Sequence, residues 1–239
     1  MKALVVIKFC IHRILYWGST FLPLRFLWKK LHSRYYHPRL DEIKNRISRA
    51  KLEPSSSIFV RWSAQLNQPL NLMNKKVLEI GHGGAWYLAQ ALDEGASYAV
   101  GYEISDELNQ RAYSALWQLG YRDFELITGN GKDLDTLNGY KFDLIYSVTV
   151  LQHLPTRTTK RYLCDAVKLL NDDGFFVVQT LHSYGKSMKR VSVTDLFSVA
   201  YSEKEFALHC ENAGLKQVSF ARENYESKET YWGIYLLTK

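Results

Sequence analysis

The sequence predicts an α/β protein built on a doubly wound parallel sheet. From residue 75 onward, short apolar runs alternate with longer stretches of helical period. Such alternation is typical of a parallel sheet covered by helices. A turn containing Gly81, Gly83 and Gly84 joins the first strand of this series to its first helix. With 239 residues, the chain is long enough for one substantial domain plus an extension and too short for two large domains.

The expected elements follow one another along the chain. A first strand ends at the glycines, and further strands are expected at 97–104, 124–128, 142–148, 174–181, 218–221 and 232–237. Helices are expected at 40–52, from residue 86, from 105 to about 120, from the fourth strand through 170, and at 203–213. The last two strands need not have a helix between them, so they need not run parallel.

Positive charge is concentrated near the N-terminus. Residues 1–74 contain 13 of the 31 Lys and Arg residues but 3 of the 24 Asp and Glu residues, a net charge of +10. The rest of the chain therefore has a net charge of −3, although the whole protein is at +7. This asymmetry indicates an anionic partner for the N-terminal part, such as a membrane surface, a phosphorylated carrier or nucleic acid.

Residues 1–30 are apolar and aromatic, with interspersed Lys and Arg. Their longest charge-free piece, 14–24, has 11 residues, whereas a membrane-spanning helix needs about 20. Lys8 and Arg13 also interrupt the apolar region that a secretory signal would need. Two interpretations remain, namely a segment in the lipid interface and a helix packed on the domain. We expect residues 1–61 to form this basic extension and residues 62–239 to form the main domain.

The cysteines indicate a reducing compartment. Cys10, Cys164 and Cys210 are odd in number and show no C-x-x-C spacing, so neither a disulfide framework nor a metal site is expected. We therefore expect a cytoplasmic protein.

The glycine-rich turn lies in the stretch KKVLEIGHGGAWYLAQAL, residues 75–92. A dinucleotide fingerprint, G-x-G-x-x-G, would need a third glycine where this chain has Trp86. A nicotinamide-dependent reductase is therefore disfavoured. A nucleoside without a pyrophosphate needs only the bare backbone turn and a polar group before it, which Glu79 supplies.

An acidic residue ends the second expected strand. Glu103 stands 22 residues after Gly81, and a carboxylate at this place can accept hydrogen bonds from both hydroxyls of a ribose. Together with the glycine turn, this position predicts a nucleoside site.

Several stretches in order resemble the motifs of class I S-adenosylmethionine (SAM)-dependent methyltransferases. E-I-G-H-G-G at 79–84 resembles their first motif, and G-N-G-K-D-L at 129–134 is similar to G-D-x-x-D-L with Asn130 in place of Asp. FDLIYSVTVLQHL at 142–154 resembles the fourth motif, and 171–180 and 201–218 match later elements. The resemblance covers about residues 72–239 and leaves the N-terminal extension outside.

The resemblance implies a Rossmann-like seven-stranded, mostly parallel sheet with an antiparallel last strand pair, preceded by the basic helical extension. It also implies SAM as the cofactor. Asn130 would accept a hydrogen bond from the adenine amino group through its side-chain oxygen, without charge assistance. The cofactor-binding residues implied are Glu79, Gly81, His82, Gly83, Glu103, Ile104, Asn130, Gly131, Ser147 and Val148.

The reaction implied is attack by an oxygen or nitrogen in line with the methyl group. Catalysis would come mostly from positioning, with a histidine removing a proton. His153 is the first candidate, although local packing is the competing interpretation. His182 and Tyr184, which are expected to follow the fifth strand and face the same rim, are further candidates.

The acceptor is not identified by the sequence. A small molecule or a lipid- or phosphate-linked glycan fits an enzyme whose residues 1–30 contact the inner face of a membrane. A nucleic-acid methyltransferase is less favoured, because Tyr-Ser-Val-Thr at 146–149 replaces the Asn/Asp-Pro-Pro-aromatic motif of base-amine methylation. A non-catalytic scaffold with the same fold remains an alternative.

Overall fold

The computed structural model describes residues 38–190, 198–223 and 229–239. The expectations for residues 1–30, at the lipid interface or packed on the domain, lie outside this range. Within the described residues, no helix combines the length and the apolar character needed to cross a membrane.

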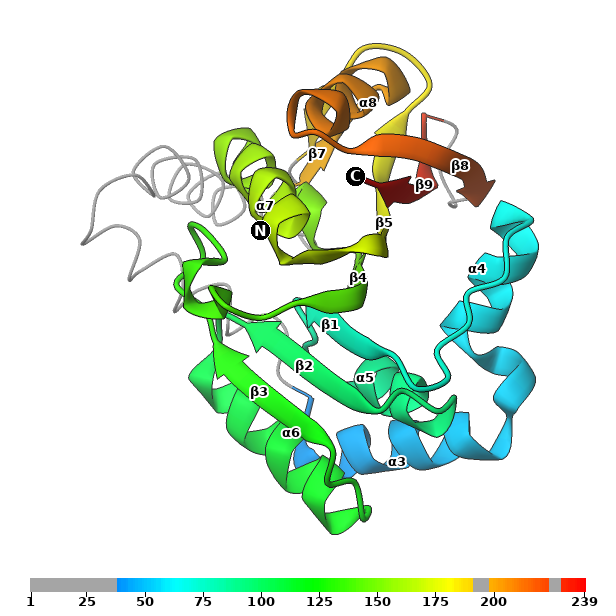
Figure 1. The fold of residues 1–239 in the computed structure, drawn as a ribbon, viewed down its shortest axis with the longest axis vertical. Helices are drawn as coiled ribbons and strands as arrows, with labels where there is room; N and C mark the ends of the chain where they lie inside the picture. Colours follow the sequence, from blue (N-terminus) through cyan, green and yellow to red (C-terminus); the bar gives the residue numbers. More distant parts are fainter. Residues whose placement is uncertain (1–37, 191–197, 224–228) are drawn as a thin grey trace, which may run out of the picture.

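The core of the protein is a seven-stranded sheet in the order β3-β2-β1-β4-β5-β9-β8 (Figure 1). The five strands from β3 to β5 run parallel, whereas β9 is antiparallel to both β5 and β8. The predicted mostly parallel sheet with an antiparallel last pair is therefore confirmed. The strands are β1 (Lys76–Ile80), β2 (Tyr98–Glu103), β3 (Phe124–Thr128), β4 (Phe142–Val148), β5 (Leu170–Ser183), β8 (Lys216–Glu223) and β9 (Thr230–Thr238).

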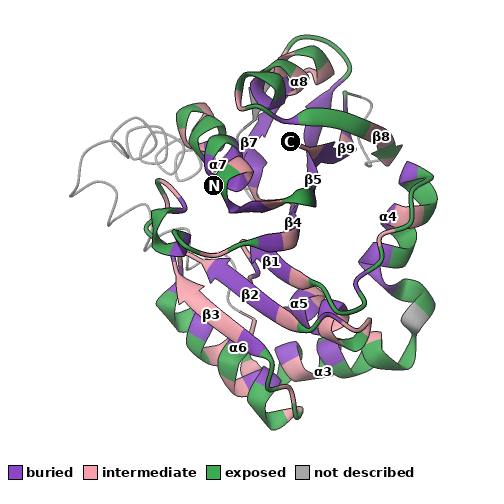
Figure 2. Ribbon diagram, viewed as in Figure 1, coloured by how far each residue is buried: buried purple, intermediate pink, exposed green. Residues whose placement is uncertain are grey.

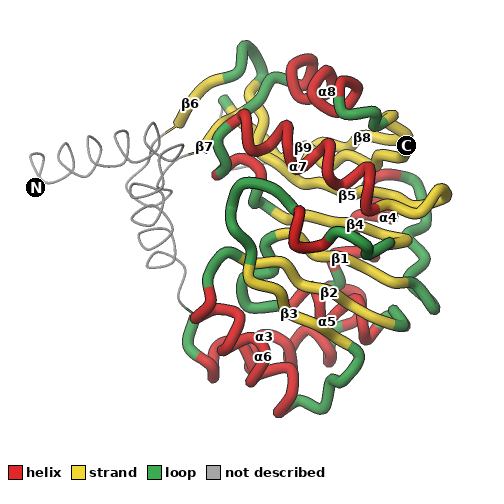
Figure 3. The backbone as a smooth tube through the Cα atoms, turned by 60° about the vertical axis from the view of Figure 1, so that its left-hand side comes forward, coloured by secondary structure: helices red, strands yellow, loops and turns green. Residues whose placement is uncertain are grey.

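Helices cover both faces of the sheet, and each face has its own apolar cluster (Figures 1 and 3). One face is packed against α3 (Leu40–Leu52), α4 (Ile58–Leu66), α5 (Trp86–Asp93) and α6 (Asp106–Gln118). The other is packed against α7 (Thr156–Leu169) and α8 (Glu203–Asn212). Figure 2 shows that the buried residues of these helices face the sheet while their outer sides are exposed.

Serine caps fix where three of these helices begin, and Ser57 caps α4 by accepting from the Phe59 N–H at 3.2 Å. The side chain of Ser105 accepts a hydrogen bond from the Leu108 N–H at 3.3 Å, and that of Ser202 accepts one from the Glu205 N–H at 3.2 Å. These bonds satisfy backbone donors that the first helical turn leaves without partners. The cap at Ser105 agrees with the helix start predicted at residue 105.

The fifth strand is longer than predicted at both ends, because it begins at Leu170 rather than residue 174 and runs on to Ser183 rather than ending at residue 181. The extension to Ser183 exists because His182 and Ser183 pair with Tyr231 and Thr230 of β9. His182 therefore lies within a strand and does not follow it. A small two-stranded sheet of β6 (Met188–Arg190) and β7 (Ser198–Ala200) was not predicted either.

The boundary predicted between residues 61 and 62 falls inside α4, which the sequence interpretation missed. Phe59 and Trp62 of this helix are buried in the same cluster as Val77 of β1. The Phe59 ring also meets the Tyr146 ring of β4 edge-on, with 5.0 Å between their centroids. Helices α3 and α4 are thus part of the packed domain rather than a separate extension.

Candidate functional site

The turn after β1 needs glycine for two reasons. Gly81 has a φ of +77°, a region that side chains disfavour. A Cβ at Gly81 would also lie 2.4 Å from Cγ2 of Val150. Val150 belongs to the loop after β4, so the loops that follow β1 and β4 touch at this point. Adjacent loops at the carboxyl ends of strands are where open α/β sheets bind ligands.

His82 points into the protein rather than outward from the turn. Its Nε2 lies 2.6 Å from Oδ1 of Asn109 on α6, and Asn109 Nδ2 donates to Oγ1 of Thr128 at 2.7 Å. Burial lowers the pKa of His82, so its imidazole is neutral and Nε2 donates to Asn109. These hydrogen bonds join the turn after β1 to α6 and to the end of β3. Asn109 and Thr128 carry no motif signal and were missed in the sequence.

The Glu103 carboxylate is held by backbone N–H groups at the end of β2. Its Oε1 accepts from Ile104 N at 2.7 Å and from Ser105 N at 3.1 Å, while Oε2 accepts from Gly83 N at 3.2 Å. A carboxylate offers about four lone-pair positions, so Oε2 retains capacity for one further donor. The carboxylate is therefore fixed beside the glycine turn and can still accept a ligand hydroxyl.

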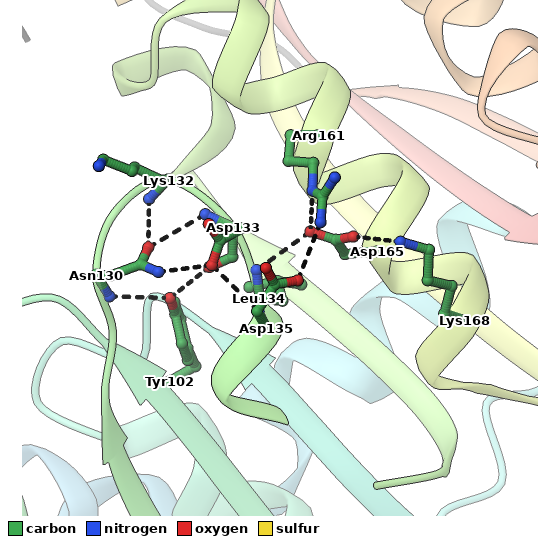
Figure 4. Close-up of polar contacts among 9 residues, drawn as sticks. All are labelled: Tyr102, Asn130, Lys132, Asp133, Leu134, Asp135, Arg161, Asp165 and Lys168. Atoms are coloured by element: carbon green, nitrogen blue, oxygen red, sulfur yellow. Dashed lines mark hydrogen bonds and ion pairs between the residues drawn. The ribbon is translucent and has the colours of Figure 1, made fainter. Parts of the chain in front are cut away.

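The loop after β3 folds around Asn130 (Figure 4). Its Oδ1 accepts from the N–H groups of Lys132 at 2.6 Å and Asp133 at 3.2 Å, and its Nδ2 donates to Oδ1 of Asp133 at 2.5 Å. The Asn130 oxygen is thus engaged within the loop, where the sequence interpretation expected it to meet an adenine. Gly131, with a φ of +70°, lets the loop turn inside this arrangement.

The end of β4 is tied to the end of β1. Ser147 is fully buried, and its Oγ donates to the Ile80 carbonyl at 3.1 Å. Thr149, which was not singled out in the sequence, has a φ of +55°, a conformation uncommon outside glycine and found at functional sites. The Thr149 N–H donates to the Gln179 carbonyl of β5 at 3.1 Å, which holds the chain in this position.

Glu79 is buried rather than open at the turn. Its exposed fraction is 1%, and the Tyr146 hydroxyl donates to its Oε2 at 3.4 Å. Burial raises the pKa of Glu79 well above its usual range, an effect that the Tyr146 hydrogen bond partly opposes. Glu79 therefore helps to fix β1 against β4 as a neutral acid.

His153 lies in the short turn η4 (Leu151–His153) directly after β4. Gln152 Nε2 is 3.3 Å from His153 Nε2, and Gln152 Oε1 accepts from Oγ1 of Thr180 at 3.4 Å. Since Gln152 is buried and Thr180 belongs to β5, this contact orients the imidazole from the protein interior. Gln152 stands inside the L-Q-H-L pattern, the only signal that could have identified it.

His182 and Tyr184 do not lie together on a common rim. His182 has no exposed surface, and its ring stacks on that of Tyr231 with 5.6 Å between centroids. Its neighbours also include Phe206 and Tyr235. Tyr184 is mostly exposed, and its ring contacts that of Tyr231 with 4.7 Å between centroids. Burial lowers the pKa of His182 to about 4, which makes it a poor base at neutral pH.

Most of the predicted site residues nevertheless converge at the carboxyl ends of β3, β2, β1 and β4, which are neighbours in that order. The turn after β1, Glu103, the loop after β3 and the segment from Ser147 to His153 all follow or end these strands. Such a row can accommodate an elongated nucleoside ligand, with the ribose at Glu103 and a reacting group near β4.

Comparison with known proteins agrees with this geometry. Residues 77–174 match the family model described as "Methyltransferase domain". A curated relative, "Ubiquinone biosynthesis O-methyltransferase" from Neisseria meningitidis serogroup A, is 23% identical over 159 residues. That match covers 61% of this chain and 65% of the relative, so it spans less than two thirds of the relative's length.

Solved structures share the fold. A 1,6-didemethyltoxoflavin-N1-methyltransferase from Burkholderia thailandensis, bound to 1,6-didemethyltoxoflavin and S-adenosylhomocysteine, is similar with a TM-score of 0.61 at 19% identity. The similarity covers 80% of this chain and 78% of that one. The [4+2]-cyclase SpnF has a TM-score of 0.63 at 11% identity and covers 76% of this chain and 79% of its own. The reaction must therefore be argued from the site rather than from the fold.

Proposed function

We propose that this chain, whose residues 77–174 match a methyltransferase-domain model, is a class I SAM-dependent methyltransferase that transfers a methyl group from SAM to an oxygen or nitrogen of a small-molecule acceptor. The fixed Glu103 carboxylate carries this proposal. It stands at the end of β2, beside the glycine turn, and retains capacity to accept a hydroxyl.

The residues at the sheet edge fit the parts of this cofactor. Glu103 would accept the ribose hydroxyls, and the bare backbone at Gly81 and Gly83 would let the methionine portion approach β1 and β4. The base would extend toward β3 and the loop around Asn130 and Gly131. Val148 ends β4 and Thr149 follows it, so these two residues would lie near the reacting end of the cofactor. SAM, when bound, supplies an electrophilic methyl group.

The role of the protein's own residues is mainly to hold the acceptor in line with the methyl carbon. In this transfer the acceptor would take the methyl group as its bond to sulfur breaks, which leaves S-adenosylhomocysteine, and the acceptor's proton would pass to His153. Gln152 Nε2, which lies 3.3 Å from His153 Nε2, would have to give up this long contact if Nε2 takes the proton. We assign this role to His153 rather than to His182, which is buried and has a lowered pKa. Replacing His153 by Ala should lower kcat by about 10²- to 10⁴-fold and leave S-adenosylhomocysteine affinity unchanged.

Two relatives support a small-molecule acceptor, since one is named for ubiquinone biosynthesis and the other was solved with 1,6-didemethyltoxoflavin. The basic, aromatic residues 1–30 support a finer proposal, in which the acceptor is linked to a lipid or a phosphate and the protein binds an anionic membrane surface. Deleting residues 1–30 should abolish sedimentation with anionic liposomes, and unchanged sedimentation would contradict this part.

The cofactor assignment is tested by calorimetric titration of the full chain with SAM, S-adenosylhomocysteine and NADH. We expect micromolar binding of the two adenosyl ligands, its loss in Glu103→Ala, and its retention in Asp106→Ala, an exposed acid on the next helix. Binding of NADH instead would overturn the proposal. Adenosyl binding without methyl transfer to any acceptor would favour a scaffold, and a salt-dependent shift of RNA would favour a nucleic-acid acceptor.

A further inference from the structure

The loop from Gly129 to Asp135 is where the base of the proposed cofactor would lie. Strand β3 is at the edge of the sheet and β2 is its neighbour. A ligand whose ribose is held at Glu103 on β2, with its reacting end near β4, directs its base toward the loop after β3. This step depends on the function proposed above.

Asp165, a residue of α7, contacts this loop (Figure 4). Its side chain is 4% exposed, and its Oδ2 accepts from the Leu134 N–H at 3.2 Å. Arg161 Nε also donates to Oδ2 at 2.8 Å, while Lys168 Nζ donates to Oδ1 at 2.9 Å. A buried carboxylate is costly unless it is paired in this way. Removing the Asp165 carboxylate would leave the Leu134 N–H, Arg161 and Lys168 without this partner.

The loop is also held by Arg161 of α7 and, from β2, by Tyr102. Arg161 donates through its second arm to Oδ1 of Asp135 at 3.0 Å. From the opposite side, the Tyr102 hydroxyl of β2 donates to the Asp133 carbonyl at 2.6 Å and accepts from Asn130 N at 3.1 Å. The loop is therefore fixed between β2 and α7, and Asp165 is the buried anchor on the α7 side.

We propose that Asp165 is a positioning residue for recognition of the cofactor's base. It acts through the Leu134 N–H and through the Arg161–Asp135 pair, which set the position of the loop against which the base lies. The ligand class affected is a nucleoside with an exocyclic amine, because a loop held in one place can discriminate that amine from an oxygen by hydrogen bonding.

The test compares Asp165→Ala, Asp165→Asn and Lys168→Ala in the full chain. Calorimetry would measure binding of S-adenosylhomocysteine and of S-inosylhomocysteine, in which an oxygen replaces the exocyclic amine. In Asp165→Ala we expect S-adenosylhomocysteine affinity to fall about tenfold or more and the preference over the inosyl analogue to shrink. Asp165→Asn should recover part of both effects, since its oxygen can still accept from Leu134 N–H. Lys168→Ala, which keeps that contact, should stay within about twofold of wild type.

Thermal unfolding and circular dichroism establish which variants are folded at the titration temperature. If Asp165→Ala does not fold, Asp165→Asn carries the test, with a smaller loss of preference expected. A folded variant with unchanged affinity and preference overturns the inference but leaves the proposed function intact. An equal loss for both analogues also overturns it, because this indicates general destabilisation. If wild type binds neither ligand, the proposed function fails, and the inference fails with it.

Discussion

The buried imidazole of His182 should make the folded protein sensitive to acid. Burial lowers its pKa to about 4, an effect to which Arg222 adds and which Glu203 opposes, whereas an unfolded histidine titrates near 6.5. Between these values the unfolded chain binds a proton that the folded chain does not, so the free energy of unfolding falls as the pH falls. A shift of this size corresponds to about 2 kcal/mol lost between about pH 7.5 and pH 5.

The perturbation that isolates this effect is His182→Leu, a non-titrating side chain of similar size. Urea unfolding, followed by tryptophan fluorescence and far-UV circular dichroism, would give the free energy of unfolding at both pH values. The variant should lose about 2 kcal/mol less than wild type on acidification. Burial also lowers the pKa values of His82 and His209, but their contributions are common to both proteins. An equal loss in wild type and variant would show that His182 titrates normally, and would refute the reasoning.

Two further predictions concern buried polar groups. The raised pKa of Glu79 means that stability is lost as the pH rises above the ordinary value of 4.5. The difference in free energy of unfolding between Glu79→Gln and wild type should therefore shift in favour of the variant as the pH rises through that window. The expected shift is up to about 1.4 kcal/mol per pH unit, measured by urea unfolding. The Tyr235 hydroxyl is buried without a hydrogen-bond partner among the described residues. Tyr235→Phe should thus be neutral or stabilising by about 1 kcal/mol in thermal unfolding, whereas Tyr231→Phe, which loses a bond to Glu203, should destabilise.

The order of strands and helices was predictable because the local spacing of apolar residues indicates which segments are strands and which are helices. The apolar runs at 124–128 and 142–148 coincide with β3 and β4, and the helix expected at 40–52 coincides with α3. The extension of β5 to Ser183 was not predictable, because it depends on pairing with β9, more than forty residues later in the sequence. Helix α4 was missed although the sequence carries two signals for it, the N-cap Ser57 and the apolar residues Ile58, Trp62 and Leu66 at helical spacing. The helix is short and lies between Pro54 and Pro69, which were interpreted as marks of an irregular segment.

The backbone features of the site were also accessible from sequence, but the directions of its side chains were not. Position 81 requires glycine because of its positive φ and because Val150 lies close to it, so both constraints can be recognised from the residue type. The orientation of His82 depends on Asn109, and that of Asn130 on the N–H groups of its own loop. These partners could not be read from a motif, since the same residue types would fit a ligand equally well.

One continuous segment, from β4 through α7, contacts both the glycine turn and the loop after β3 and also contains His153. Val150 lies against the glycine turn, Gln152 orients His153 from the interior, and Asp165 anchors the loop after β3. Methyl transfer in line requires the acceptor, the methyl carbon and the rest of the cofactor to be fixed relative to one another. Because the acceptor side and the base side are held by the same segment, a change that displaces α7 should impair base recognition and proton removal together. A surface change on α3 should impair neither.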